Sequence, residues 1–145
     1  LAEYPALLQQ VPRNSILTPH PKEFERLFGS SQNEVNRLEI LSREAVSRHL
    51  YILLKGRYTA MACPDGSIYF NPTGNPGMAT GGSGDVLTGI LTGLLAQGYS
   101  SKETLLLGVW IHGYAGDIAA AEHSQEAMTA ADIIMGLGQV FKEGI

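Results

Sequence analysis

The sequence predicts an α/β fold in which short strands are followed by packed helices. Three observations lead to this class. Apolar runs of strand length alternate with helical patterns in the first half of the chain. A glycine-rich loop follows them, and the second half consists almost entirely of helical patterns. The sequence contains no internal repeat, low-complexity tail or linker that would divide it.

The strands are predicted from apolar runs bounded by turn residues. YILLK is a continuous apolar run with one charge at its end, which is typical of a buried strand of the parallel type. The turn Pro64-Asp65-Gly66 has residue types that favour a tight turn, so we expect a hairpin around it. The expected strands cover residues 15–18, 51–55, 59–63 and 67–70.

The helices of the first half are predicted from their boundaries and spacing. Pro21 suits the first position of a helix that Gly29 ends. Residues 32–49 carry apolar side chains at helical spacing with Glu and Arg between them. Residues 3–10 are expected to be the end of a further helix. Pro19 and Pro21 should hold the intervening His20 in extended backbone.

The second half is expected to contain three helices. Residues 71–98 should form loop in their first part and helix in their second part, and residues 102–122 should form a long helix. Thr129 and Asp132 fit a capping box, which predicts a last helix that runs through Phe141.

Composition excludes several classes of protein. Ten Lys and Arg against 14 Asp and Glu leave no basic stripe for a phosphate backbone, so we expect no nucleic-acid partner. A hydrophobic content of 44% disfavours disorder. The single Cys63 excludes a disulfide framework and a cysteine-rich metal site. No targeting or membrane-spanning stretch is found, so we expect a cytoplasmic protein with no membrane partner.

The glycines are concentrated in one stretch. Eight lie from Gly74 to Gly98, and Asp85 is the one charged residue between Asp65 and Lys102. Each ordered glycine lowers the stability of the fold by about 0.5–1 kcal/mol relative to alanine. A loop with this many glycines is therefore expected to have a function. Glycine N–H groups that precede a helix favour the binding of an anion, and phosphate is the expected ligand. The pattern GGSGDV is neither a P-loop nor a dinucleotide fingerprint.

Asp85 is the candidate catalytic residue of this stretch. A carboxylate repels a nearby phosphate, so its presence at an anion site calls for a function. It could act as the general base that removes the proton from a hydroxyl group as that hydroxyl attacks a phosphoryl group. The alternative is that Asp85 merely caps the helix. Gly89 and Gly93 lie four residues apart, and we expect them to allow close helix packing.

The remaining polar candidates are expected to be structural. His112 lies within an apolar helical run, which predicts a core histidine in a polar network with Asp117 rather than a metal ligand. His49 and His123 are expected to be exposed, and the histidines lack zinc-binding spacing. Cys63 is expected to be a small apolar residue.

Several segments in order resemble one family. TGNPGMATGGSGDVLTGILTGLLAQG resembles the signature of the ADP/ATP-dependent NAD(P)H-hydrate dehydratases of the ribokinase-like superfamily. TPHPKEFERLFG resembles the family's substrate motif, and LLKG resembles its nucleotide strand. HGYAGDIAA and MTAADII resemble its closing helices. The resemblance covers the chain from Leu17 to Phe141 and implies the ribokinase-like three-layer α/β fold.

The resemblance implies a repair reaction. Hydrated NADH or NADPH would be phosphorylated on the ring hydroxyl by ADP or ATP and would then lose phosphate, which restores NAD(P)H. The implied co-substrate is ADP or ATP, with Mg²⁺ bridging its phosphates and no metal ligand from the protein. Because relatives commonly form tetramers, a homo-oligomer is expected.

The resemblance also implies roles for individual residues. Asp85 matches the catalytic base, and Gly82, Ser83 and Gly84 match the anion hole. His20 matches a substrate-contacting histidine, and Asp85 also contacts the substrate. The implied nucleotide-binding residues are Lys55, Gly56, Arg57, Tyr58, Thr59, Asn75 and Gly84.

Two other functions would use the same sequence features. A ribokinase-like kinase for a small alcohol or vitamin precursor would share the base and the anion hole and would leave phosphate on its product. A non-catalytic nucleotide-binding module is the second alternative, because family domains are much longer than 145 residues. Residues 1–145 are accordingly expected to be a single partial domain, the C-terminal portion of a dehydratase domain.

Overall fold

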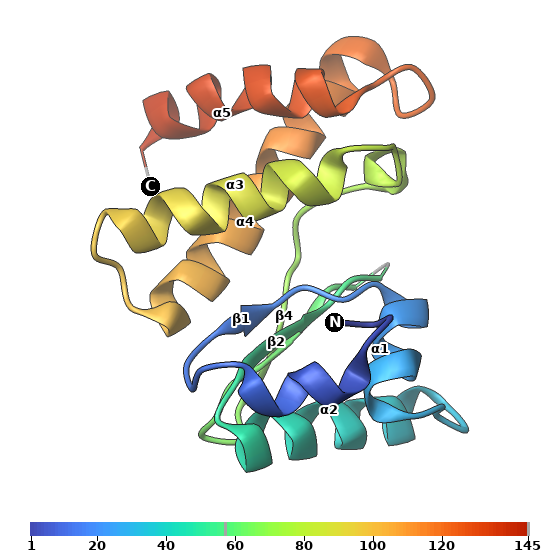
Figure 1. Ribbon diagram of the computed structural model, residues 1–145. Helices are drawn as coiled ribbons and strands as arrows, with labels where there is room; N and C mark the ends of the chain where they lie inside the picture. The colour runs from blue at the N-terminus through green and yellow to red at the C-terminus, as the bar shows by residue number, and fades with distance from the viewer. Residues whose placement is uncertain (57, 145) are drawn as a thin grey trace. The chain divides into compact units, whose positions relative to one another are not determined.

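The computed structural model describes residues 1–56 and 58–144. The chain divides into two compact units, Leu1–Phe70 and Asn71–Ile145. Figure 1 colours the first unit from blue to green and the second from green to red. All described strands belong to the first unit, and the second is helical. This arrangement confirms the prediction of an α/β chain whose strands precede its packed helices.

The first unit is built on a four-stranded sheet. Its strands follow one another in the order of the sequence, and their bounds are β1 Ile16–Leu17, β2 Tyr51–Leu54, β3 Ala60–Ala62 and β4 Ile68–Phe70. Strand β2 pairs parallel with β1 and antiparallel with β3, so the expected parallel pairing holds on one side only. The predicted hairpin is confirmed as the antiparallel pair β3–β4.

Three helical segments complete the first unit. Helix α1 covers Pro21–Phe28 and α2 covers Glu34–Arg48, as the spacing predicts, while residues 5–10 form the short 3₁₀ helix η1 (Pro5–Gln10). Helix α2 packs against β2 and β3, and its buried Leu41 and Ala45 face Ile52 and other apolar side chains of the sheet. His49 ends α2 in the left-handed conformation and is exposed, as expected.

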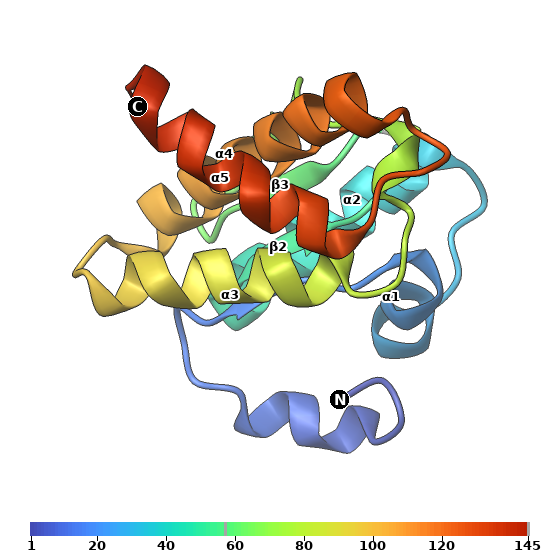
Figure 2. The ribbon, with the colours of Figure 1, turned by 90° about the horizontal axis from the view of Figure 1, so that it is seen from above.

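The second unit contains three long helices and one short 3₁₀ helix. Their bounds are η2 Pro76–Met78, α3 Ser83–Ala96, α4 Ser101–His123 and α5 Ala130–Glu143. Helix α4 packs against both α3 and α5 (Figures 1 and 2). Its buried Ile111, Ala115 and Ala119 form a core with Leu94 of α3 and Ile133 of α5. Of the helices that the structure describes, none is long and apolar enough to cross a bilayer.

The close helix contacts lie elsewhere than the sequence pattern predicts. Added Cβ atoms at Gly89 and Gly93 would meet nothing within 4 Å, so the packing role expected for this pair is wrong. A Cβ at Gly113 of α4 would instead lie 2.8 Å from the carbonyl carbon of Thr73. Helix α4 is the central helix of the unit. Its small residues let the glycine-rich segment, residues 74–84, approach its backbone.

We expect Gly113→Ala and Gly89→Ala to change stability in opposite directions. The first adds a methyl group where no space exists, and overpacking of this kind costs about 1–3 kcal/mol. The second adds a methyl group on an open helix face, where alanine is favoured over glycine by about 0.5–1 kcal/mol. Urea unfolding of the two variants measures both effects, and equal changes would contradict the packing described here.

The cap of α5 predicts a pH dependence of stability. The Thr129 hydroxyl and N–H both donate to Asp132 Oδ2 at 2.7 Å, and these hydrogen bonds lower the pKa of Asp132. A lowered pKa adds stability above the ordinary Asp pKa of about 3.9, and that stability is lost as pH falls through the folded value. We expect Asp132→Asn to flatten the fall in unfolding free energy below about pH 4. Urea unfolding across this range tests it, with Thr129→Val as a second variant that removes the hydroxyl donor.

Candidate functional site

The first turn of α3 presents backbone N–H groups that have no partner within the described part of the chain. Gly82, the N-cap, has a φ of +89°, which is in the left-handed region. No hydrogen bond between described residues uses the N–H of Gly82 or of Gly84. The Ser83 N–H makes a long hydrogen bond of 3.4 Å to the Thr80 carbonyl oxygen. Free N–H groups and the helix dipole together favour an anion at this position.

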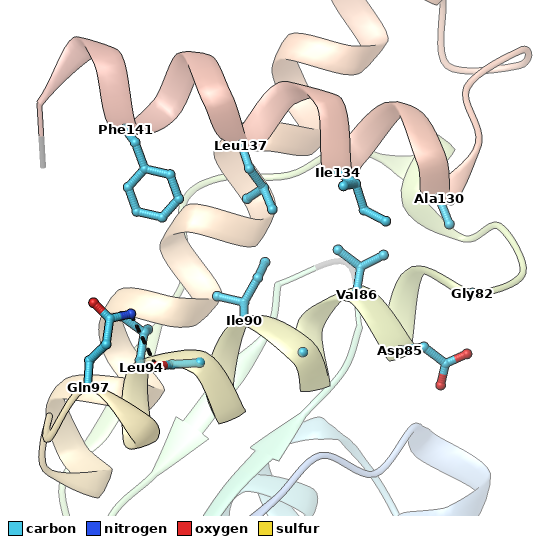
Figure 3. A pocket seen from close by; sticks show the side chains of 12 residues that line it. Gly82, Asp85, Val86, Ile90, Leu94, Gln97, Ala130, Ile134, Leu137 and Phe141 are labelled. Atoms are coloured by element: carbon cyan, nitrogen blue, oxygen red, sulfur yellow. Dashed lines mark hydrogen bonds between the residues drawn. The ribbon is translucent and has the colours of Figure 1, made fainter.

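Asp85 stands on the same turn. Its side chain is exposed, and it makes no hydrogen bond or ion pair with any residue that the structure describes. Figure 3 shows the carboxylate directed away from the apolar side chains of α5. Because Gly82 is the N-cap and no side chain caps this helix, the capping alternative is not what the structure shows. The carboxylate is therefore available to a ligand at the first turn of α3.

Helix α4 holds the start of the glycine-rich segment. Asp117 accepts from the Gly74 N–H through Oδ2 at 2.9 Å and from Asn75 Nδ2 through Oδ1 at 3.0 Å. Asn75 Nδ2 also donates to the Gly116 carbonyl oxygen, and Asn75 Oδ1 accepts from the Gly77 N–H. The Asn75 amide thus serves the fold of the loop, while its predicted contact with nucleotide stays a prediction.

His112 holds the other end of the segment. The residue is 9% exposed, and its Nε2 lies 3.0 Å from the Ser83 carbonyl oxygen and 3.4 Å from Ser83 Oγ. The predicted core histidine is confirmed. His112 contacts Ser83 and Asp117 contacts Gly74 and Asn75, so both bind the glycine-rich segment, while a single network that joins His112 to Asp117 stays a prediction. The expected exposure of His123 and the helix-capping role of Asp132 are confirmed as well, and Cys63, expected to be a small apolar residue, is buried.

An apolar groove of about 600 Å³ runs between α3 and α5 (Figure 3). Gly82 and Asp85 lie at one end and Gln97 at the other. Gly89 and Gly93 leave part of its wall without side chains, which is why no atom meets them. Its remaining lining is Val86, Ile90, Leu94, Ala130, Ile134, Leu137 and Phe141.

The first unit brings two other predicted segments together. Strands β1 and β2 are parallel, so the residues that follow them lie at the same edge of the sheet. The Lys55 N–H donates to the Pro19 carbonyl oxygen at 3.2 Å, which places the segment of His20 beside that of Lys55. Of the neighbouring predicted nucleotide residues, Gly56 and Tyr58 are exposed and Thr59 is half-buried. Arg57 lies outside the described residues.

The His20 ring is held by the helix that it begins. Nδ1 accepts from the Glu23 N–H at 3.3 Å, and the Glu23 carboxylate accepts from the His20 N–H at 2.8 Å. This capping box leaves Nε2 as the protonated nitrogen of the neutral ring. Sequence reasoning missed Glu23, although the spacing of three residues signals a capping box, because histidine is not a usual N-cap.

The described residues contain no group of three or more His, Cys, Asp or Glu side chains arranged to hold a metal ion. A cation at the start of α3 would therefore depend on oxygen atoms of a bound ligand and on water. Asp85 and the predicted anion-hole residues belong to the second unit, and His20 and Lys55 belong to the first.

The fold and the candidate anion site indicate the class of protein to which this chain belongs. A left-handed glycine, free N–H groups and an exposed Asp one turn into a helix suit phosphoryl transfer. The ribokinase of Arabidopsis thaliana, solved with ribose and ATP, matches 92% of this chain with a TM-score of 0.55 at 16% identity. That match covers 43% of the ribokinase and shows that the fold is ribokinase-like.

The family follows from closer matches. The family model described as NAD(P)H-hydrate dehydratase matches residues 1–137, so the chain belongs to the NAD(P)H-hydrate dehydratase family. The bifunctional NAD(P)H-hydrate repair enzyme Nnr of Moorella thermoacetica is 49% identical over 129 residues, which are 88% of this chain and 24% of that protein.

A solved relative carries the same fold. The ADP/ATP-dependent NAD(P)H-hydrate dehydratase of Bacillus subtilis, co-crystallised with ATP and Mg²⁺, has a TM-score of 0.83 at 38% identity. The match covers 92% of this chain and 50% of that one. The chain thus spans between a quarter and a half of the length of these relatives.

Gly82→Ala should disturb the first turn of α3, whereas Gly81→Ala should not. An alanine at position 82 would adopt a left-handed conformation that costs about 1–2 kcal/mol, and its Cβ would lie 3.2 Å from that of Ala130. Position 81 has no positive φ, and a Cβ there meets nothing within 4 Å. Urea unfolding compares the two variants. An equal loss of stability in both would contradict the conformation described for Gly82.

Proposed function

We propose that the chain takes part in ADP- or ATP-dependent dehydration of hydrated NAD(P)H to NAD(P)H. The observation that carries the proposal is the exposed Asp85 carboxylate one turn from the free N–H groups of Gly82 and Gly84. Membership of the dehydratase family and the ATP and Mg²⁺ of the Bacillus subtilis crystals supply the substrate class. In this proposal residues 1–145 are the C-terminal portion of one dehydratase domain.

The reaction begins with a proton transfer. Asp85 removes the proton from the ring hydroxyl of the hydrate, and the oxygen attacks the terminal phosphoryl group of the nucleotide. An O–P bond forms to the substrate, and the bond from that phosphorus to the leaving nucleotide oxygen breaks. The N–H groups at the start of α3, from Gly82, Ser83 and Gly84, face the negative charge of the transferring group.

Elimination completes the repair. The C–O bond of the phosphorylated ring breaks, phosphate leaves with the electron pair, and a proton leaves the adjacent ring carbon, which restores the double bond. Mg²⁺ would be held by the nucleotide phosphates and water, where it neutralises their charge, because the described residues offer no cluster of three ligands.

Further residues bind the substrate and the nucleotide in this proposal. His20 binds the hydrated nicotinamide substrate, as does Asp85. The nucleotide contacts come from Lys55, Gly56, Arg57, Tyr58, Thr59, Asn75 and Gly84. The parallel strands β1 and β2 support this assignment, because they bring the segments of His20 and Lys55 to one sheet edge.

A dehydratase accounts for the chain better than a kinase does. The kinase fold neighbour is 16% identical and shares the fold alone, whereas the relatives named for NAD(P)H-hydrate repair are 38–49% identical.

We further propose a homo-oligomer that acts in the cytoplasm. The exposed Ile134, Met135 and Phe141 on α5 support association of copies, since exposed apolar side chains are often covered in assemblies.

Asp85→Asn should lower the rate of NADH recovery by about 10²–10⁴-fold, because the amide cannot accept the hydroxyl proton. The assay supplies hydrated NADH, ADP or ATP, and Mg²⁺, and follows NADH absorbance. Glu122→Gln removes an exposed carboxylate on the last turn of α4 and serves as the matched control. No NADH recovery with the unaltered protein would overturn the dehydratase and favour a non-catalytic nucleotide-binding module, and a stable phosphorylated product would favour the kinase. An unchanged rate for Asp85→Asn in an active protein would overturn the role of Asp85 as the base.

A further inference from the structure

The contact between His112 and Ser83 joins the core of the second unit to the anion site. His112 is buried in the middle of α4, twenty-nine residues further along the chain than Ser83. Its Nε2 reaches both the carbonyl oxygen and the hydroxyl of Ser83, the first residue of α3. The neighbours of Ser83 are Gly82 and Gly84, whose N–H groups have no acceptor among the described residues.

The shorter distance determines the tautomer of the ring. A carbonyl oxygen can only accept a hydrogen bond, so a separation of 3.0 Å from Nε2 requires a hydrogen on that nitrogen. The Ser83 hydroxyl at 3.4 Å then faces an N–H donor and acts as an acceptor toward the ring. Its own hydrogen is left to point to another acceptor, and no such acceptor occurs among the described residues.

We propose that His112 is a positioning residue that fixes the first turn of α3, so that the Ser83 hydroxyl and the flanking glycine N–H groups are presented to a phosphate group. This inference rests on the proposed function for the identity of the reaction. His112 itself does not touch the substrate, and its effect passes through Ser83. A histidine that merely fills the core would make the same apolar contacts without directing Ser83.

Three variants separate positioning from core packing. His112→Leu fills the core but has no donor, whereas His112→Gln keeps an amide N–H at about the reach of Nε2. Ile111→Val perturbs the fully buried neighbouring position on α4 and is the control for a loosened core. Circular dichroism and urea unfolding establish that each variant is folded before it is compared.

The first readout is turnover of hydrated NADH with ADP or ATP and Mg²⁺. We expect His112→Leu to lower kcat by about 10²-fold, because small misplacements of a reacting group cost this much. We expect His112→Gln to recover most of that loss and Ile111→Val to leave kcat unchanged. If the unaltered protein is active and His112→Leu retains its kcat, or if His112→Gln loses as much as His112→Leu, the positioning role is overturned.

The second readout does not depend on turnover. In ¹⁵N-labelled protein, ADP should shift the amide resonance of Gly84 in the unaltered chain and in His112→Gln, and should do so at least tenfold more weakly in His112→Leu. An inactive protein that shows this pattern would overturn the proposed reaction and support the positioning role. Equal shifts in all variants, or no shift in the unaltered chain, would overturn the positioning role itself.

Discussion

The second unit depends on the hydrogen bonds by which α4 holds the glycine-rich segment. Asp117 ties down its beginning at Gly74 and Asn75, and His112 holds its end at Ser83. Between these anchors Gly82 lies in the left-handed region, which few residues other than glycine adopt. A chain this rich in glycine would otherwise lose much conformational entropy on ordering, and the anchors on α4 offset that cost.

The same interaction places structural polar groups close to Asp85, the candidate catalytic residue. Asp85 is free toward solvent because the polar contacts that stabilise the turn are made by other residues on its inner side. The buried His112 lies within hydrogen-bonding distance of the Ser83 carbonyl oxygen, while the N–H groups of Gly82 and Gly84 have no acceptor among the described residues. Donors that are held in place and have no internal partner are what electrostatic stabilisation of a transferring phosphoryl group requires.

Much of the fold could be predicted from local signals. Pro21 and Gly29 bounded α1, and the capping box of Thr129 and Asp132 began α5, because these residues act on the backbone within one turn. The orientation of β2 between a parallel and an antiparallel neighbour was only half predicted. Strand pairing depends on segments that are distant in the sequence, and an apolar run does not indicate whether its neighbouring strands are parallel or antiparallel.

The sequence by itself determined the composition of the candidate anion site: the residue types, the single Asp85 and its place at the start of a helix. Only the tertiary structure decided which polar groups make hydrogen bonds within the described fold and which have no partner there. It assigned the Asn75 amide to the fold of the loop, and it placed Gly113, rather than Gly89, against another backbone. It also brought His112 to Ser83 across twenty-nine residues. Spacing along the chain sets what a residue can reach within its own helix, whereas partners on other elements are set by how the helices pack.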